Sequence, residues 1–222
     1  MTTITPPVSL VALSEPQSAA AEAFRTLRTN IQFAGLDRTL QLISVTSAGV
    51  DEGKSAVAAN LAITMAQAEQ RVVLVDCDLR RPALHTLFGL NNEQGITTML
   101  LASEGTAAPL QATSVPGLSL LASGPLPPRP ADILGSRRFG EILQSLRDSA
   151  DVVIIDTPPV LAVTDAVVLA PRVDGVILVM RAGHTRREPA KQAKTVLEKA
   201  KANIVGIVLN DAELNATTDY YG

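Results

Sequence analysis

Glycine, lysine and serine follow one another at positions 53–55, and these three residue types together are suited to holding a nucleotide phosphate. Backbone N–H groups at the start of a helix present partial positive charge to phosphate oxygens. Gly53 lets the backbone approach closely, the Lys54 ammonium reaches the β- and γ-phosphates, and the Ser55 hydroxyl is a ligand for Mg²⁺. The segment 48–55 therefore predicts a phosphate-binding loop. The expected ATP-binding residues are Gly49, Asp51, Glu52, Gly53, Lys54, Ser55 and Ala56.

The loop departs from the usual motif in two places. Ala48 stands where the motif has glycine, and the carboxylates of Asp51 and Glu52 stand where small residues are common. We expect these two side chains to point to solvent, because a carboxylate pointing inward would repel phosphate and weaken binding. The alternative is an ordinary strand, turn and helix with a chance Gly-Lys-Ser, and the acidic residues elsewhere in the chain weigh against it.

Three aspartates stand at the ends of two apolar segments. Asp76 and Asp78 follow the first segment, and Asp156 ends the second. Ligands of an open parallel sheet bind at the carboxyl ends of its strands, so all three carboxylates should converge on the phosphate loop. Oxygen ligands suit Mg²⁺, and Asp156 matches the acidic residue that organises the magnesium shell in P-loop NTPases. The alternative for a lone aspartate at a strand end is a helix N-cap.

Apolar runs that alternate with helical patterns must position these groups. Such alternation predicts an α/β fold, a doubly wound and mostly parallel sheet flanked by helices. Residues 1–14 look extended, 124–130 form a Pro-rich loop, and a helix runs from Ser14 until Gly35 ends it. Strands are expected at 41–46, 71–76, 118–121, 152–156, 176–180 and 204–209, and further helices at 53–69, 137–147, 164–170 and 187–201, with short ones near Leu84 and Thr97.

The bulk composition fits this fold and excludes several functional classes. The chain has 222 residues, enough for one domain with a short arm or tail, and 46% of them are hydrophobic. A net charge of −3 gives the chain no excess of positive charge with which to bind nucleic acid. The single Cys77 excludes an internal disulfide and is compatible with a reducing compartment. The sequence has neither a secretory signal nor a membrane-spanning apolar run, so we expect a cytoplasmic protein.

The combined motifs resemble the bacterial tyrosine kinases of capsule and exopolysaccharide synthesis, with a fold like that of MinD and ParA. The resemblance runs from about Ser14 to the C-terminus. Its segments are the phosphate loop with Ala58-Ala59-Asn60-Leu61-Ala62, the acidic stretch 73–82 (Val-Leu-Val-Asp-Cys-Asp-Leu-Arg-Arg-Pro), the strand end 154–159 (Ile-Ile-Asp-Thr-Pro-Pro) and the helical stretch 22–28 (Glu-Ala-Phe-Arg-Thr-Leu-Arg).

The resemblance implies a mechanism. A tyrosine hydroxyl, usually from a neighbouring subunit's C-terminal tail, attacks the γ-phosphate of ATP. Lys54 and Mg²⁺ absorb the developing charge, and Asp76 either orients the hydroxyl or also deprotonates it. The implied catalytic residues are Lys54, Asp76, Asp78 and Asp156, and the implied metal ligands are Ser55, Asp78 and Asp156. Arg80 braces the acidic loop or meets a neighbouring subunit.

The resemblance also implies partners. Glu22, Arg25 and Arg28 lie along one side of a helix, where spacing alone indicates a solvated face with intrahelical pairs. The family motif favours ion pairs between subunits of a ring instead. Residues 1–210 would form the kinase domain, with the oligomerisation helix at about 15–35. The chain resembles members without a membrane domain, which need a membrane adaptor of the polysaccharide co-polymerase type and are recruited to the inner face of the membrane.

The tail at 211–222 carries both tyrosines of the chain, Tyr220 and Tyr221, which are the implied phosphoacceptors beside tyrosines of other proteins. Family members usually have a longer tyrosine cluster, so the alternative is a terminus that happens to be aromatic. Two rival functions stay open. One is a ParA/MinD-like switch ATPase, which normally carries an extra lysine near the start of its loop, where Ala48 and Gly49 stand here. The other is a nucleotide-binding scaffold with little kinase activity.

Overall fold

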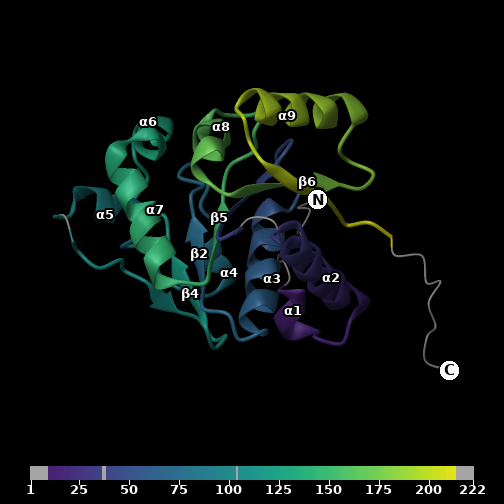
Figure 1. Ribbon diagram of the computed structural model, residues 1–222, viewed down its shortest axis with the longest axis horizontal. Coiled ribbons are helices and arrows are strands. Elements are labelled where there is room, and N and C mark those ends of the chain that lie inside the picture. Colours follow the sequence, from purple (N-terminus) through teal and green to yellow (C-terminus); the bar gives the residue numbers. More distant parts are fainter. Residues whose placement is uncertain (1–9, 37–38, 104, 214–222) are drawn as a thin grey trace, which may run out of the picture.

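A seven-stranded, mostly parallel sheet forms the centre of the computed structural model, which describes residues 10–36, 39–103 and 105–213 (Figure 1). The strands are β1 (Leu42–Ser47), β2 (Val72–Asp76), β3 (Gln111–Ala112), β4 (Leu118–Leu121), β5 (Val152–Asp156), β6 (Gly175–Arg181) and β7 (Ile204–Asn210), in the spatial order β3-β4-β2-β5-β1-β6-β7. The helices are α1 (Val11–Ser14), α2 (Ala19–Ala34), α3 (Lys54–Ala66), α4 (Leu84–Leu87), α5 (Ile96–Leu101), α6 (Pro130–Gly135), α7 (Arg137–Ser149), α8 (Asp165–Leu169), which a 3₁₀ turn follows, and α9 (Arg187–Lys199).

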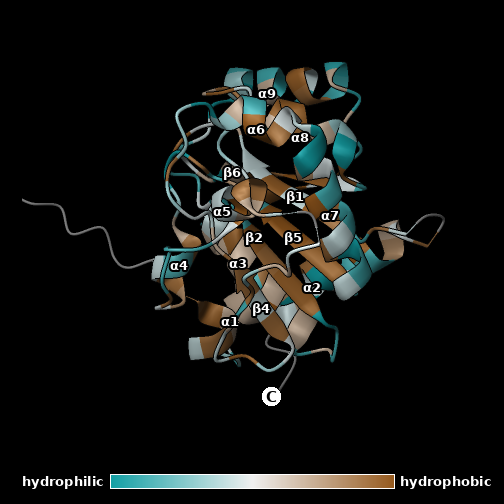
Figure 2. Ribbon diagram, turned by 90° about the vertical axis from the view of Figure 1, so that its left-hand side faces the viewer, coloured by the Kyte–Doolittle hydropathy of each residue, from teal (hydrophilic) through white to brown (hydrophobic). Residues whose placement is uncertain are grey.

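The central strands are covered on both faces. Every residue of β1, β2 and β5 is buried. Side chains alternate across a strand, so Ile43 of β1 packs with α1, α2 and α3, whereas its neighbour Leu42 packs with α5, α6 and α7. Figure 2 shows the brown apolar strands between helices whose outer surfaces are teal. Burial on two faces explains the continuous apolar runs and confirms the doubly wound fold.

Parallel pairing places the functional strand ends at one edge. Asp76 of β2 is in register with Asp156 of β5, and Asp156 is also in register with Val45 of β1. The phosphate loop starts directly after β1. The carboxylates and the loop therefore meet at the carboxyl edge of the sheet.

Four elements differ from the sequence prediction. The expectation of an extended chain over 1–14 is wrong for α1, because Ala12 is buried against α3, where Asn60 accepts a hydrogen bond from its N–H at 2.9 Å. The helix expected from Ser14 begins instead at Ala19, where the Ser18 hydroxyl accepts from an N–H group of the first turn. Helix α6, with Pro130 at its first turn, and the two-residue strand β3 were not predicted.

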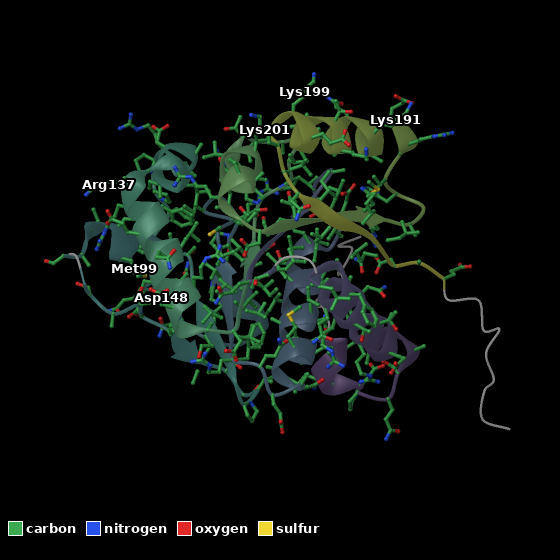
Figure 3. All side chains as sticks on the ribbon, viewed as in Figure 1. Met99, Arg137, Asp148, Lys191, Lys199 and Lys201 are labelled. Atoms are coloured by element: carbon green, nitrogen blue, oxygen red, sulfur yellow. The ribbon has the colours of Figure 1, made fainter. Side chains whose placement is uncertain are left out.

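Helix α9 closes the opposite side of the sheet from α2 and α3. Ala193 and Leu197 are its buried side chains. Lys191 and Lys199 are exposed and lie on its outer side (Figure 3). Among the described residues, no helix combines the length and the apolar character that spanning a membrane requires.

Candidate functional site

The phosphate loop joins β1 to the N-terminus of α3 and contains two left-handed residues, Asp51 (φ 57°) and Gly53 (φ 86°). A Cβ atom on Gly53 would lie 2.1 Å from Nδ2 of Asn210, so glycine serves both the backbone conformation and the packing here. Helix α3 begins at Lys54, and the N–H groups of its first turn have no partner within the helix. The loop therefore offers a concave set of donors and the positive end of a helix to an anion.

Lys54 joins the loop to the acidic strand ends. Its Nζ lies 2.8 Å from Oδ2 of Asp78 and 3.3 Å from both carboxylate oxygens of Asp156. It also donates to the Ser55 hydroxyl oxygen at 3.1 Å. Burial by itself would lower the pKa of Lys54, but the carboxylates of Asp156 and Asp78 outweigh it and hold that pKa above its ordinary value. The ammonium is therefore fixed in its charged form at the mouth of the loop.

Asp156 and Ser55 form the second part of the site. The Ser55 hydroxyl donates to Oδ2 of Asp156 at 2.5 Å, and the Asp156 side chain is fully buried. Burial raises the pKa of Asp156, although Lys54 and the Ser55 hydroxyl oppose the shift. A hydroxyl and a carboxylate at this distance offer two oxygen ligands on one side of the loop.

Asp76 is buried at the end of β2. Its Oδ2 accepts hydrogen bonds from the N–H groups of Ala83 and Leu84 at 3.1 and 3.0 Å, and its Oδ1 accepts from the N–H of Asp78. The side chain thus makes the cap-like contacts expected of the N-cap alternative, at the start of α4. Burial, reinforced by the charge of Asp156, raises the pKa of Asp76 from 3.8 to about 7. A carboxyl with this pKa exchanges its proton near neutral pH, as a general base requires.

These residues fit Mg²⁺ and a nucleotide phosphate. Within the described part of the chain, no three His, Cys, Asp or Glu side chains are grouped as a protein-only metal site. Mg²⁺ usually retains several waters and binds through one or two protein oxygens together with phosphate oxygens. Ser55 and Asp156 would supply that small donor set. Asp78 pairs with Lys54 at the same end of the loop. Its carboxylate would hold waters of the magnesium shell.

The position of the Glu52 side chain differs from the prediction for the phosphate loop. Its side chain is only 3% exposed, so the expectation that it points to solvent is wrong, although Asp51 is exposed as expected. The Glu52 carboxylate accepts from the N–H of Gly49 at 3.0 Å and from the Thr185 hydroxyl at 2.6 Å. The first donor belongs to the loop itself, and the second belongs to the turn that follows β6. The carboxylate therefore binds the loop to the body of the protein.

Arg80 braces the acidic stretch, one of its two expected roles. Its Nε and Nη2 donate to the two oxygens of Asp165 at 2.8 and 3.0 Å, and the Asp165 side chain is fully buried. The pair ties the segment after β2 to the first turn of α8. A two-pronged contact of this type fixes orientation as well as position. Sequence reasoning did not pair Arg80 with Asp165.

The proposed oligomerisation residues make contacts within the single chain. Nε of Arg25 lies 2.7 Å from Oε2 of Glu22, which is the intrahelical pair that spacing alone indicates. Arg28 turns the other way and donates to the carbonyl oxygen of Thr64 on α3 at 2.8 Å. Glu22 remains largely exposed and is accessible to another subunit. Tyr220 and Tyr221, the expected phosphoacceptors, lie outside the described residues.

Comparisons with known proteins show the family to which the chain belongs. The family model ParA, described as the NUBPL iron-transfer P-loop NTPase, matches residues 38–219. The tyrosine-protein kinase YwqD of Bacillus subtilis is 42% identical over 212 residues, which cover 96% of this chain and 90% of that protein. The kinase domain of Escherichia coli tyrosine kinase ETK superposes with a TM-score of 0.88 at 35% identity, covering 96% of this chain and 84% of the other. The chimerical protein CapA2B2 gives a TM-score of 0.86 at 36% identity, covering 91% and 89%.

Proposed function

This chain belongs to the bacterial tyrosine-protein kinases with a ParA-like P-loop NTPase fold, and on that premise we propose that it transfers the γ-phosphoryl group of ATP to tyrosine hydroxyls. The observation that carries the proposal is the position of the Lys54 ammonium, between Asp78 and Asp156 and at the N-terminus of α3. A fixed cation at a phosphate loop serves phosphoryl transfer, in which positioning and charge neutralisation supply most of the catalysis.

Each residue of the site has a defined task in this reaction. The N–H groups of the loop hold the phosphates, and Lys54 neutralises charge that develops on the transferred group. Ser55 and Asp156 would hold Mg²⁺, with Asp78 on waters of its shell, and the ion would add positive charge against the charge of the phosphates. Asp76 accepts the proton of the attacking tyrosine hydroxyl, because its raised pKa leaves it able to bind that proton near pH 7. The new bond joins the tyrosine oxygen to phosphorus as the bond to ADP breaks.

The acceptor tyrosines are the tail residues Tyr220 and Tyr221 of a neighbouring subunit, together with tyrosines of other proteins. The tail begins at Asp211, directly after β7 ends at the carboxyl edge of the sheet. This starting point supports an acceptor role for the tail. We place the activity in the control of exopolysaccharide or capsule synthesis, with a membrane adaptor of the polysaccharide co-polymerase type as activator. That adaptor would bring this chain to the inner face of the membrane.

A switch ATPase of the same fold is the second candidate function. Members of that class normally carry an additional lysine at the start of the loop, and residues 48–50 here are Ala, Gly and Val. A kinase transfers the γ-phosphoryl group to tyrosine, whereas a switch ATPase transfers it to water. With ATP and Mg²⁺, we expect phosphotyrosine to form in proportion to ADP at early times. ADP and free phosphate without phosphotyrosine, even in the presence of an adaptor segment, would support the ATPase or the scaffold instead.

Assembly into a ring is part of the proposal and rests on Glu22 and Arg25. The side chain of Glu22 is 66% exposed, so its pair with Arg25 is exchangeable with a pair across a subunit contact. We expect the Glu22→Ala, Arg25→Ala double variant to sediment as a monomer at protein concentrations where the parent is an oligomer. The Lys194→Ala, Glu198→Ala variant, which removes an exposed pair from α9, should sediment like the parent. Equal sedimentation of all three proteins would show that Glu22 and Arg25 are not needed for assembly.

A further inference from the structure

We infer that Glu52 and Thr185 form a latch at the phosphate loop, and that Thr185 is a positioning residue for nucleotide binding. The inference deepens the proposed function and rests on its nucleotide site. Glu52 lies in the loop, whereas Thr185 lies 133 positions away in the turn between β6 and α9. Their contact at 2.6 Å is the link by which this turn fixes the carboxylate, and through it the N–H of Gly49.

The direction of the Thr185 hydroxyl is set by a third group. Its oxygen accepts a hydrogen bond from the N–H of Arg181 at 2.7 Å, and the N–H of Thr185 returns a bond to the Arg181 carbonyl at 2.9 Å. The turn is therefore closed on itself. Because the hydroxyl oxygen already serves as an acceptor there, its hydrogen is left to donate to Glu52. The Glu52 carboxylate therefore accepts from a hydroxyl whose direction is fixed by Arg181.

The Glu52 carboxylate makes contacts different from those of the Lys54 ammonium. Lys54 contacts Asp78 and Asp156, while the Glu52 side chain, Thr185 and the loop residues 48–50 line a surface pocket of about 440 Å³. Asn210 also donates to the Glu52 carbonyl oxygen, at 3.2 Å. A buried carboxylate is costly unless it is hydrogen-bonded. Its two donors explain how a negative residue is tolerated inside a loop that binds anions.

The hydrogen bonds of Glu52 keep the phosphate loop in its nucleotide-binding conformation before a nucleotide is present. The loop holds its N–H groups in a concave arrangement only while residues 49–53 keep their conformation, which includes left-handed backbone at Asp51 and Gly53. Closing the 49–52 turn with an internal carboxylate fixes this conformation before nucleotide arrives. A loop that is already ordered loses less entropy on binding, so the affinity for nucleotide rises.

The test compares Thr185→Val, which keeps the shape and removes the hydroxyl, with Thr185→Ser, which restores it. Thr195→Val on the exposed side of α9 is the matched control. With the magnesium complex of the non-hydrolysable ATP analogue AMP-PNP, we expect Thr185→Val to bind about tenfold more weakly, the effect of one hydrogen bond to a charged group. Thr185→Ser and Thr195→Val should bind within about twofold of the parent, the scatter of substitutions that keep the contacts.

A second measurement does not depend on nucleotide binding. Hydrogen exchange of the peptide spanning the phosphate loop should be about tenfold faster in nucleotide-free Thr185→Val than in the parent, and unchanged in Thr195→Val. Unchanged exchange and unchanged affinity in Thr185→Val would overturn the latch, and so would an equal loss in Thr185→Ser. If the parent itself fails to bind AMP-PNP, the proposed function fails, while the exchange rates still decide whether the latch exists.

Discussion

Replacing Lys54 with Met should reduce tyrosine phosphorylation about 10²–10³-fold, the range for removing one fixed group that stabilises charge in a transition state. The methionine side chain keeps the length and the apolar stem of lysine and removes the ammonium that lies 2.8 Å from Asp78. Three buried aspartates, Asp76, Asp78 and Asp156, would then share the site without their cation. Phosphotyrosine formed per minute at saturating ATP is the measurement.

Lys191→Met is the control for this substitution. Lys191 lies on the outer side of α9 and is exposed, so the same change of residue there leaves the site intact (Figure 3). Its rate should equal that of the parent. A Lys54→Met protein that is folded by circular dichroism and transfers phosphate at the parental rate would remove Lys54 from the mechanism.

Replacing Asp76 with Asn should slow phosphorylation about 10²–10⁴-fold, the usual contribution of a general base. The amide oxygen can still accept from the N–H groups of Ala83 and Leu84, so the start of α4 should persist. Affinity for AMP-PNP should change little, because Lys54 keeps its contacts with Asp78 and Asp156. A large loss of affinity with an unchanged rate at saturation would contradict the role of base and assign Asp76 to nucleotide binding.

The pH dependence of the free energy of unfolding of the nucleotide-free protein should report the raised pKa of Asp76. Its pKa is 3.8 ordinarily and about 7 in the fold, where Lys54, Asp78 and Asp156 face it. Between these values the folded state holds a proton that the unfolded state has released, so the free energy of unfolding should fall as pH rises from about 4 to about 7. Urea unfolding of Asp76→Asn should show a shallower fall over that range. An identical pH slope in the two proteins would contradict the raised pKa.

Much of the site follows from the sequence because its parts are local or repeat along the chain. The Gly-Lys-Ser run at 53–55 lies within one strand, turn and helix, and the buried strands read as apolar runs. Parallel pairing then brings Asp76 and Asp156 to one edge without any knowledge of side-chain contacts.

The features that sequence reasoning missed depend on contacts between distant positions. Thr185 carries no motif, and its role exists only because β6 lies beside β1 and brings its turn to the loop. Asn210 is likewise placed against Gly53 by the end of β7. Glu52 was expected to face solvent because a carboxylate in a phosphate loop should be unfavourable, and that reasoning did not include a donor from the turn after β6. Its spacing of three residues from Gly49 was the one local signal available.

Mass spectrometry of the purified chain after incubation with ATP and Mg²⁺, beside the Lys54→Met variant, tests the kinase assignment most directly. The mechanism predicts phosphate on Tyr220 or Tyr221 in the parent and on neither residue in the variant, with transfer increasing with protein concentration if the tail of one subunit enters the site of another. A parent that binds ATP yet carries no phosphotyrosine, alone and with an adaptor's cytoplasmic segment added, would contradict the assignment of a tyrosine kinase.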